Sequence, residues 1–191
     1  MGVTFMSNET PVCNIALGIL KADPIINYDT DVTVRSNWCR QFFPTTRDAV
    51  LRAYPYGFSI VRAALAADPA APVFGFYVKF GLPANPWCLR VLELDDKDLD
   101  WKVEGRFLVC NNSTVSIRYI SRVADMNLYD PMCIQAIATR LAAVLSKPIT
   151  GSSDAGLWQL YASMVQEGQT IDGMEGTLDR WESNELVDVR Y

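Results

Sequence analysis

The chain of 191 residues contains no histidine. Histidine is the side chain that most often acts as a general base near neutral pH, and it completes the nucleophilic dyads of serine and cysteine proteases. It is also one of the two residues that bind zinc most often. Its absence therefore excludes the common histidine-dependent hydrolases and removes most kinds of zinc site.

Closely spaced cysteines are also missing. The five cysteines stand at positions 13, 39, 88, 110 and 133, and none of them belongs to a CxxC pair. Zinc and redox motifs depend on such pairs. Because each cysteine lies among apolar residues, we expect buried free thiols in a protein that works in a reducing compartment.

The sequence lacks a glycine-rich phosphate loop, a GxSxG motif and any uninterrupted apolar run of about 18 residues. The first residues have no basic start followed by an apolar run, so they do not resemble a signal peptide. We therefore expect no membrane span. With 22 acidic and 17 basic residues the net charge is −5, which does not attract DNA by bulk charge but lets DNA pass without being held.

An acidic run at residues 95–100 is the one stretch that could motivate catalysis or metal binding. Asp96, Asp98 and Asp100 have the spacing that opens a calcium loop. Trp101 and Phe107 occupy the positions where that loop needs glycine and glutamate, so an EF-hand is excluded. We expect a solvated turn, no cofactor, no metal and no enzymatic activity. A hydrolase that uses an acid pair from this turn is kept as an alternative.

The clearest helix is predicted from Tyr129 to Lys147. Asp130 can cap it, Pro131 suits its first turn, and Pro148 is expected to end it. Apolar residues recur at spacings of three and four along one face, while the opposite face is mostly alanine. Such a helix is typically buried on more than one side, and we expect it to pack both in its own bundle and against a neighbouring subunit.

Three further helices are predicted, over residues 12–21, from 30 or 31 to 53, and from 155 to about 169. Pro44 should kink or divide the second of them, since a proline inside a helix costs ~3 kcal/mol. The Arg47-Asp48 pair and Arg52 are expected on its outer face. Between the second and third helices, aromatic and alternating segments predict short strands near residues 74–80, 87–94, 101–103, 106–110 and 115–119. The last three are expected to form a meander, with a tight hairpin turn at Glu104-Gly105. Trp87 and Trp101 are expected in the core of the sheet.

This order of helices, strands and helices predicts an α+β fold: a four-helix-type bundle with an inserted small antiparallel β-sheet subdomain and an extended C-terminal tail. The expected parts are residues 1–54 and 125–171 for the bundle, residues 55–124 for the β-rich insertion, and residues 172–191 for the docking tail. The tail mixes acidic residues with isolated apolar ones, so it cannot bury itself alone.

Several segments, in their order along the chain, resemble the head–tail adaptors of tailed bacteriophages, the group that includes tail tubular protein A of short-tailed phages. They are VCNIALGILKADPI, CRQFFPTTRDAVLRAYPYGFSIVRAALA, GLPANPWCLRVLELD, WKVEGRFLV and IRYISRVADMNLYDPMCIQAIATRLAAVLSKPIT, followed by the terminal LVDVRY. The resemblance covers residues 11–191.

The resemblance implies a structural virion protein that forms a twelve-fold homo-oligomeric ring beneath the portal protein. The ring would continue the channel for double-stranded DNA, hold the nozzle or tail protein below, and take part in genome ejection without binding DNA specifically. It implies a location at the head–tail junction of the virion, and in the host cytoplasm during assembly. Another neck component, a head-completion or tail-terminator protein, remains an alternative.

Two sets of partner-binding residues follow as hypotheses. The C-terminal tail of such adaptors reaches the portal, and the residues expected to bind there are Trp181, Leu186, Val187, Arg190 and Tyr191. The alanine-rich side of the central helix is the expected subunit interface, with Ala138, Arg140 and Ala142 as its residues.

Overall fold

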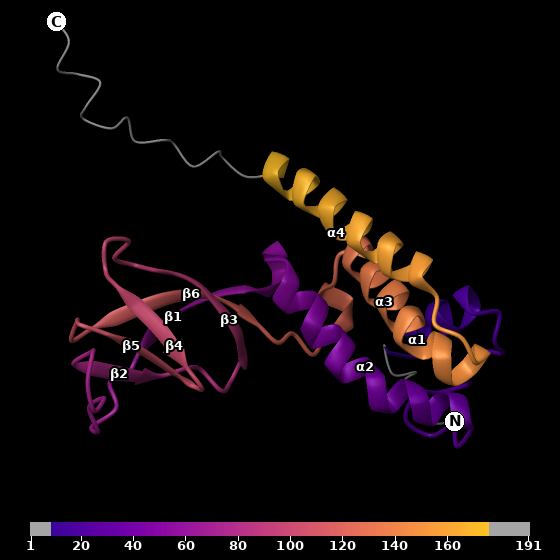
Figure 1. Cartoon of the computed structure of the whole chain (residues 1–191), viewed down its shortest axis with the longest axis horizontal. Helices are drawn as coiled ribbons and strands as arrows, with labels where there is room; N and C mark the ends of the chain where they lie inside the picture. Colours follow the sequence, from indigo (N-terminus) through magenta and orange to yellow (C-terminus); the bar gives the residue numbers. More distant parts are fainter. Residues whose placement is uncertain (1–8, 176–191) are drawn as a thin grey trace, which may run out of the picture.

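The structure is a computed structural model that describes residues 9–175, with side chains as far as residue 167. Four helices and six strands follow one another in the order α1 (Glu9–Ile19), α2 (Val34–Ala53), β1 (Ile60–Leu65), β2 (Val78–Gly81), β3 (Cys88–Leu94), β4 (Trp101–Glu104), β5 (Phe107–Cys110), β6 (Val115–Ser121), α3 (Pro131–Thr150) and α4 (Ala155–Glu175). The predicted α+β class is confirmed. The helices lie at one end of the long axis and the strands at the other (Figure 1).

Helix α3 lies at the centre of the helical part, where it contacts α1, α2 and α4. Its start is as predicted, because the Asp130 carboxylate accepts the N–H of Met132 at 2.7 Å and Pro131 fills the first position. Its predicted end at Lys147 is wrong. The helix includes Pro148 and ends at Thr150, and the next residue, Gly151, adopts a left-handed conformation with φ 83°.

Helix α2 is one continuous helix with Pro44 inside it, so the predicted division at Pro44 is wrong. It starts at Val34, a few residues after the predicted start near Thr30 or Asp31, and its cap is Thr33, whose side chain accepts the N–H of Ser36. Buried side chains on both sides of the proline hold the helix together, with Cys39 and Phe43 before it and Val50 and Leu51 after it. Burial of this size exceeds the cost of the one hydrogen bond that Pro44 removes.

Helix α4 extends to Glu175, whereas the sequence predicted its end near Gln169. The first residues of the predicted tail, 172–175, therefore belong to a helix. Residues 1–8 and 176–191, on which the remaining tail predictions fall, lie outside the described part of the chain.

The strands form two three-stranded antiparallel sheets, where the sequence predicted one small sheet. One sheet has the order β1-β6-β3 and the other the order β2-β5-β4. The predicted hairpin at Glu104-Gly105 is confirmed as the β4–β5 turn, with Gly105 at φ 60°. The expected pairing of the next strand onto this hairpin is wrong, because β6 pairs with β1 and β3 instead.

Two clusters of buried side chains correspond to the two ends of the molecule. One surrounds α3 and the other lies between the sheets, where Phe80, Leu108 and Tyr119 are buried. Strand β6 contributes to both clusters, since Tyr119 faces the sheet cluster and Ile120 faces the helix cluster. Alternate residues of a strand point to opposite faces, so β6 joins the two cores.

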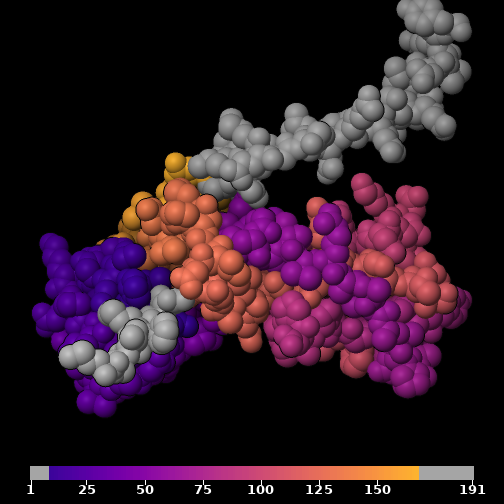
Figure 2. Space-filling model, turned by 180° about the vertical axis from the view of Figure 1, so that it is seen from behind, coloured from indigo at the N-terminus to yellow at the C-terminus, as the bar shows by residue number. Residues whose placement is uncertain are grey.

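The chain passes between the helices and the sheets through two segments that contact each other. The hydroxyl of Ser121 donates to the carbonyl of Ser59 at 3.0 Å, and both side chains are buried. Rings of Tyr56, Phe58 and Tyr129 follow one another with centroids 5.6 and 4.8 Å apart. These contacts attach the sheet part to the helical part. Together the two parts form one elongated body (Figure 2).

Among the described residues, α3 is the one helix that is long and apolar enough to cross a membrane by length and composition. The core helices of soluble proteins pass the same test. The packing of α3 against three other helices of this chain accounts for its apolar composition.

Candidate docking cleft between the helices and the sheets

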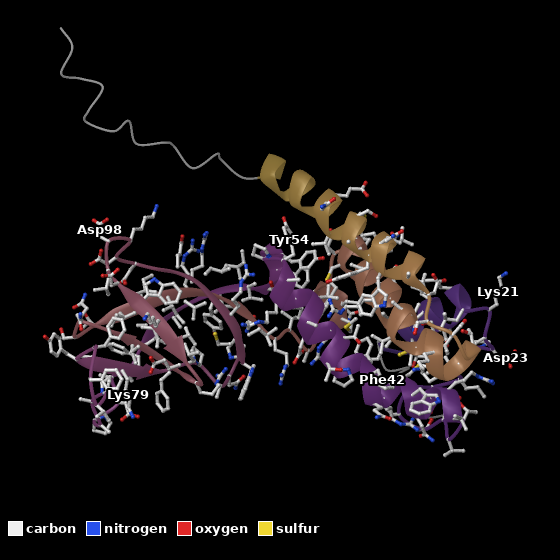
Figure 3. All side chains as sticks on the ribbon, in the orientation of Figure 1. Lys21, Asp23, Phe42, Tyr54, Lys79 and Asp98 are labelled. Carbon is white, nitrogen blue, oxygen red and sulfur yellow. The ribbon has the colours of Figure 1, made fainter. Side chains whose placement is uncertain are left out.

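A cleft of about 600 Å³ lies where the C-terminal half of α2 meets the two sheets, and we call it the junction cleft. Tyr54, at the C-terminal end of α2, marks this junction (Figure 3). The cleft is lined by α2, by β3 with the loop before it, and by the β4–β5 hairpin, through Asp48, Ala49, Arg52, Leu82, Trp87, Cys88, Leu89, Arg90, Val91, Val103, Gly105 and Arg106. It therefore combines three arginines and one acid with an apolar surface.

Asp48 is the acid on the helical side of the cleft. Its carboxylate pairs with Arg47 at 2.9 Å and with Arg122, which follows β6, at 2.5 Å. The side chain of Arg47 is only 13% exposed and that of Asp48 only 20%. These residues therefore lie at the junction and not on the outer face predicted from the sequence, and the pair with Arg122 links helix to sheet.

We expect Asp48→Ala to lower the free energy of unfolding by about 2 kcal/mol, because it leaves the largely buried Arg47 without its charged partner. Urea denaturation followed by far-UV circular dichroism measures the change. The matched control is Asp23→Ala, which breaks the exposed pair with Arg35 and should cost less than about 1 kcal/mol. Equal effects of the two variants would mean that the Asp48 ion pairs do not support the junction.

Trp87 forms the sheet-side wall of the cleft. The guanidinium of Arg106 lies 3.8 Å from its ring centroid and that of Arg122 lies 5.4 Å away. The ring is 38% exposed, so Trp87 is not the buried core residue that the sequence predicted. Stacking of this kind holds an aromatic ring in place.

The Arg106 side chain holds the walls of the cleft together through hydrogen bonds. It donates to the carbonyls of Cys88 at 2.7 Å, Pro83 at 2.6 Å and Leu82 at 3.3 Å. Arg52 donates to the carbonyl of Leu89, which fastens the end of α2 to β3. These bonds fix the loop before β3, and they occupy the backbone carbonyls of Leu82, Cys88 and Leu89, which line the cleft.

Arg90 differs from its neighbours. Within residues 9–167 no side chain or carbonyl pairs with its guanidinium, although the residue is half-buried. The acid of the cleft, Asp48, is already engaged by two arginines. The cleft is therefore locally cationic on a chain whose net charge is −5.

Exposed apolar side chains gather at both far ends of the molecule. In the loop of residues 66–77, which we call the sheet-end loop, Val73, Phe74 and Tyr77 are between 79% and 98% exposed. In the loop of residues 20–33, the helix-end loop, Ile26 and Val32 are 83% and 88% exposed. The two loops lie at opposite ends of the long axis (Figure 1).

The helix-end loop is held firmly against the helices. The Asn14 side chain bonds both the N–H and the carbonyl of Ile25, at 2.8 and 3.0 Å. Tyr28 donates its N–H to Thr10 at 2.9 Å and accepts from Arg40 at 2.6 Å. The exposed apolar side chains of this loop are thus presented by a fixed backbone.

The predicted subunit interface has no accessible alanines. Ala138 and Ala142 are 0% exposed inside the helix cluster, so they contact their own chain and offer no surface to a second subunit. Arg140 is half-buried, and its guanidinium lies 5.6 Å from the ring of Trp158 and 5.0 Å from that of Tyr161. Close packing with the other helices accounts for the alanine-rich face of α3, and a contact of Arg140 with a second subunit stays a prediction.

The residues predicted to bind the portal, Trp181, Leu186, Val187, Arg190 and Tyr191, lie outside the described residues.

The acidic run at 95–100 forms a turn in which Asp95 accepts the N–H groups of Ser116 and Asp96, and these bonds lower the pKa of Asp95. Within the described residues no group of three or more Cys, Asp or Glu side chains is placed to hold a metal ion.

All five cysteines are free and buried, as predicted. Burial raises the pKa of Cys133 to about 12, and a hydrogen bond with Cys39 raises the pKa of Cys13. Thiols with raised pKa values are poor nucleophiles at neutral pH.

No protein-family model matches the chain, and no curated protein matches it.

Proposed function

We propose that the chain is a structural virion protein, a head–tail adaptor that forms a ring between the portal and the tail or nozzle protein. The resemblance in the order of its sequence segments is the starting point. In this proposal the four helices act as a bundle that carries the two sheets as an inserted subdomain, which agrees with the position of α3 among the other helices.

The observation that carries the proposal is the pair of apolar loops at opposite ends of an elongated chain. Residues 69–77 of the sheet-end loop contain no charged residue, and three of their large apolar side chains are exposed. Exposed apolar groups that gather in this way are typical of protein-binding surfaces. A subunit that binds one partner at each end is what a neck ring between two other rings requires.

The junction supports the same role. An adaptor must keep a fixed distance between the rings on either side. The ion pair between Asp48 and Arg122, the hydrogen bond between Ser121 and Ser59, and the aromatic contacts of Tyr56, Phe58 and Tyr129 hold the helical and sheet parts together. The net charge of −5 suits a channel through which DNA slides without being held.

The proposal is tested by measuring mass in solution with and without portal protein. We expect the mixture to contain a complex in which many copies of the 21.3 kDa chain join the portal. A single-chain species alone is compatible with the proposal, since ring formation can await the portal. Chains that stay separate from the portal at every concentration would contradict it. A complex with tail components but not with the portal would favour a different neck protein.

A further inference from the structure

We propose that residues 176–191 of the chain bind in the junction cleft of the same chain before any partner is bound. The inference rests on the chemistry of the cleft and on the sequence beyond Glu175, and not on the proposed function. The proposal names residues 176–191 as the occupant of the junction cleft, whose arginines would otherwise stay exposed.

The cleft offers cations beside an apolar surface. Arg90 has no partner for its guanidinium within residues 9–167, and Arg52 uses one of its N–H groups on the carbonyl of Leu89. Trp87 is 38% exposed and Val103 is 44% exposed. A matching ligand carries carboxylates on either side of one or two apolar side chains, because these satisfy the arginines and cover the apolar wall at the same time.

The sequence of residues 176–191 has this pattern. Glu185 and Asp188 flank Leu186 and Val187, so two apolar residues stand between two acids. The segment holds four acidic residues and two arginines, which gives a net charge of −2. Its charge is therefore opposite to that of the cleft.

The segment of residues 176–191 is long enough to reach the junction cleft. Helix α4 runs from the far end of the helical part back toward the sheets, so its C-terminal end lies on the side that faces them (Figure 1). Sixteen residues follow Glu175, and a fully extended chain of that length spans roughly 50 Å. An intramolecular ligand also acts at a high effective concentration, so a few ion pairs and a small apolar contact are enough.

One consequence is a competition. A partner that captures residues 176–191 must first remove them from the cleft, and it then exposes Trp87 and Arg90. The cleft would thereby keep the segment from binding prematurely in the free chain.

Photo-crosslinking in the full-length chain tests the inference. Val187 is replaced by benzoylphenylalanine, the isolated protein is irradiated, and the crosslinked peptides are identified by mass spectrometry. We expect crosslinks to residues 82–91 and 103–106. Arg90→Glu should reduce their yield on the order of tenfold, and adding Glu185→Lys to that variant should restore much of it. Arg90→Glu breaks no described contact, so its fold should be intact, as circular dichroism can verify.

Arg62→Glu is the control, since Arg62 is an exposed arginine on β1 outside the cleft. It should leave the crosslink yield unchanged. A mixture of ordinary and ¹⁵N-labelled chains reports whether crosslinks form within one chain or between two. Crosslinks that join two chains, that fall elsewhere on the surface, or that decrease equally with Arg62→Glu would overturn the inference. No portal is present, so the outcome is independent of the adaptor proposal.

Discussion

Leu141→Ala is expected to lower the free energy of unfolding by about 3 to 4 kcal/mol. Leu141 is 0% exposed on α3, the helix that contacts each of the other three. Shortening it removes apolar contacts and leaves a cavity that a helix fixed on all sides cannot close. Urea denaturation followed by far-UV circular dichroism measures the loss, and the slope with urea should stay unchanged.

Leu160→Ala is the matched control for this prediction. The same substitution falls on α4, where the side chain is 44% exposed, so the loss should stay below about 1 kcal/mol. A difference of about 2 kcal/mol or more between the two variants is expected. If both variants had the same stability, α3 would not be the centre of the helical core.

Deletion of residues 176–191 should reduce portal binding by about a hundredfold or more while lowering the free energy of unfolding by at most about 2 kcal/mol, the contribution of a segment bound in the junction cleft. The deletion starts after α4 ends at Glu175, so it removes no described helix or strand. The proposed anchors Trp181 and Tyr191 belong to residue types that often dominate binding energy. Portal binding is measured by titration at fixed salt, and stability by urea denaturation.

Single substitutions refine this prediction. Trp181→Ala and Tyr191→Ala should each weaken portal binding by about tenfold or more, whereas Ser183→Ala, in the same segment, should change it little. Full binding by the truncated chain would show that the portal contacts other residues. Loss of the folded state on truncation would mean that the segment belongs to the core and was misinterpreted as a docking tail.

The helices could be predicted well where local chemistry decides them. Asp130 and Pro131 place the start of α3, because a cap and a first-turn proline act within a few residues. The ends of the helices were predicted less well, because each proline was taken as a point where a helix must stop or divide. Pro44 and Pro148 both lie inside helices, where packing of neighbouring side chains outweighs the lost hydrogen bond.

For the sheets, the sequence pattern could place a strand but could not predict its pairing partners. Alternation of apolar residues correctly marked Val115, Ile117 and Tyr119 as one face of a strand, and all three are buried. It could not say with which strands β6 pairs, because pairing joins residues far apart in the chain. Val61 and Val91 both lie opposite Tyr119 in the sheet, and no local pattern encodes that choice.

The junction cleft was not predicted. It brings Asp48 together with Trp87, Arg106 and Arg122, which are distant in the sequence. The sequence interpretation put Trp87 in the core and the charges of α2 on the outside, both of which are common places for such residues. The unusual run LPANPW, with two prolines before an exposed tryptophan, was the local feature that pointed to a shaped loop.

The alanine-rich face of α3 shows another limit of sequence patterns. A helix with apolar residues on one side and alanines on the other can be covered by its own chain or by another one. Ala138 and Ala142 are covered by their own chain, because short side chains let the neighbouring helices approach closely. Surface residues such as the exposed side chains of the two end loops are better candidates for contacts with partners.

The most direct test of the adaptor proposal is electron microscopy of the full-length chain mixed with purified portal protein. We expect a closed ring of many copies of the chain on one end of the portal, coaxial with its channel, and absent from portal imaged alone. Portal particles that look the same with and without the chain, together with unassembled single chains in the same images, would contradict the proposal.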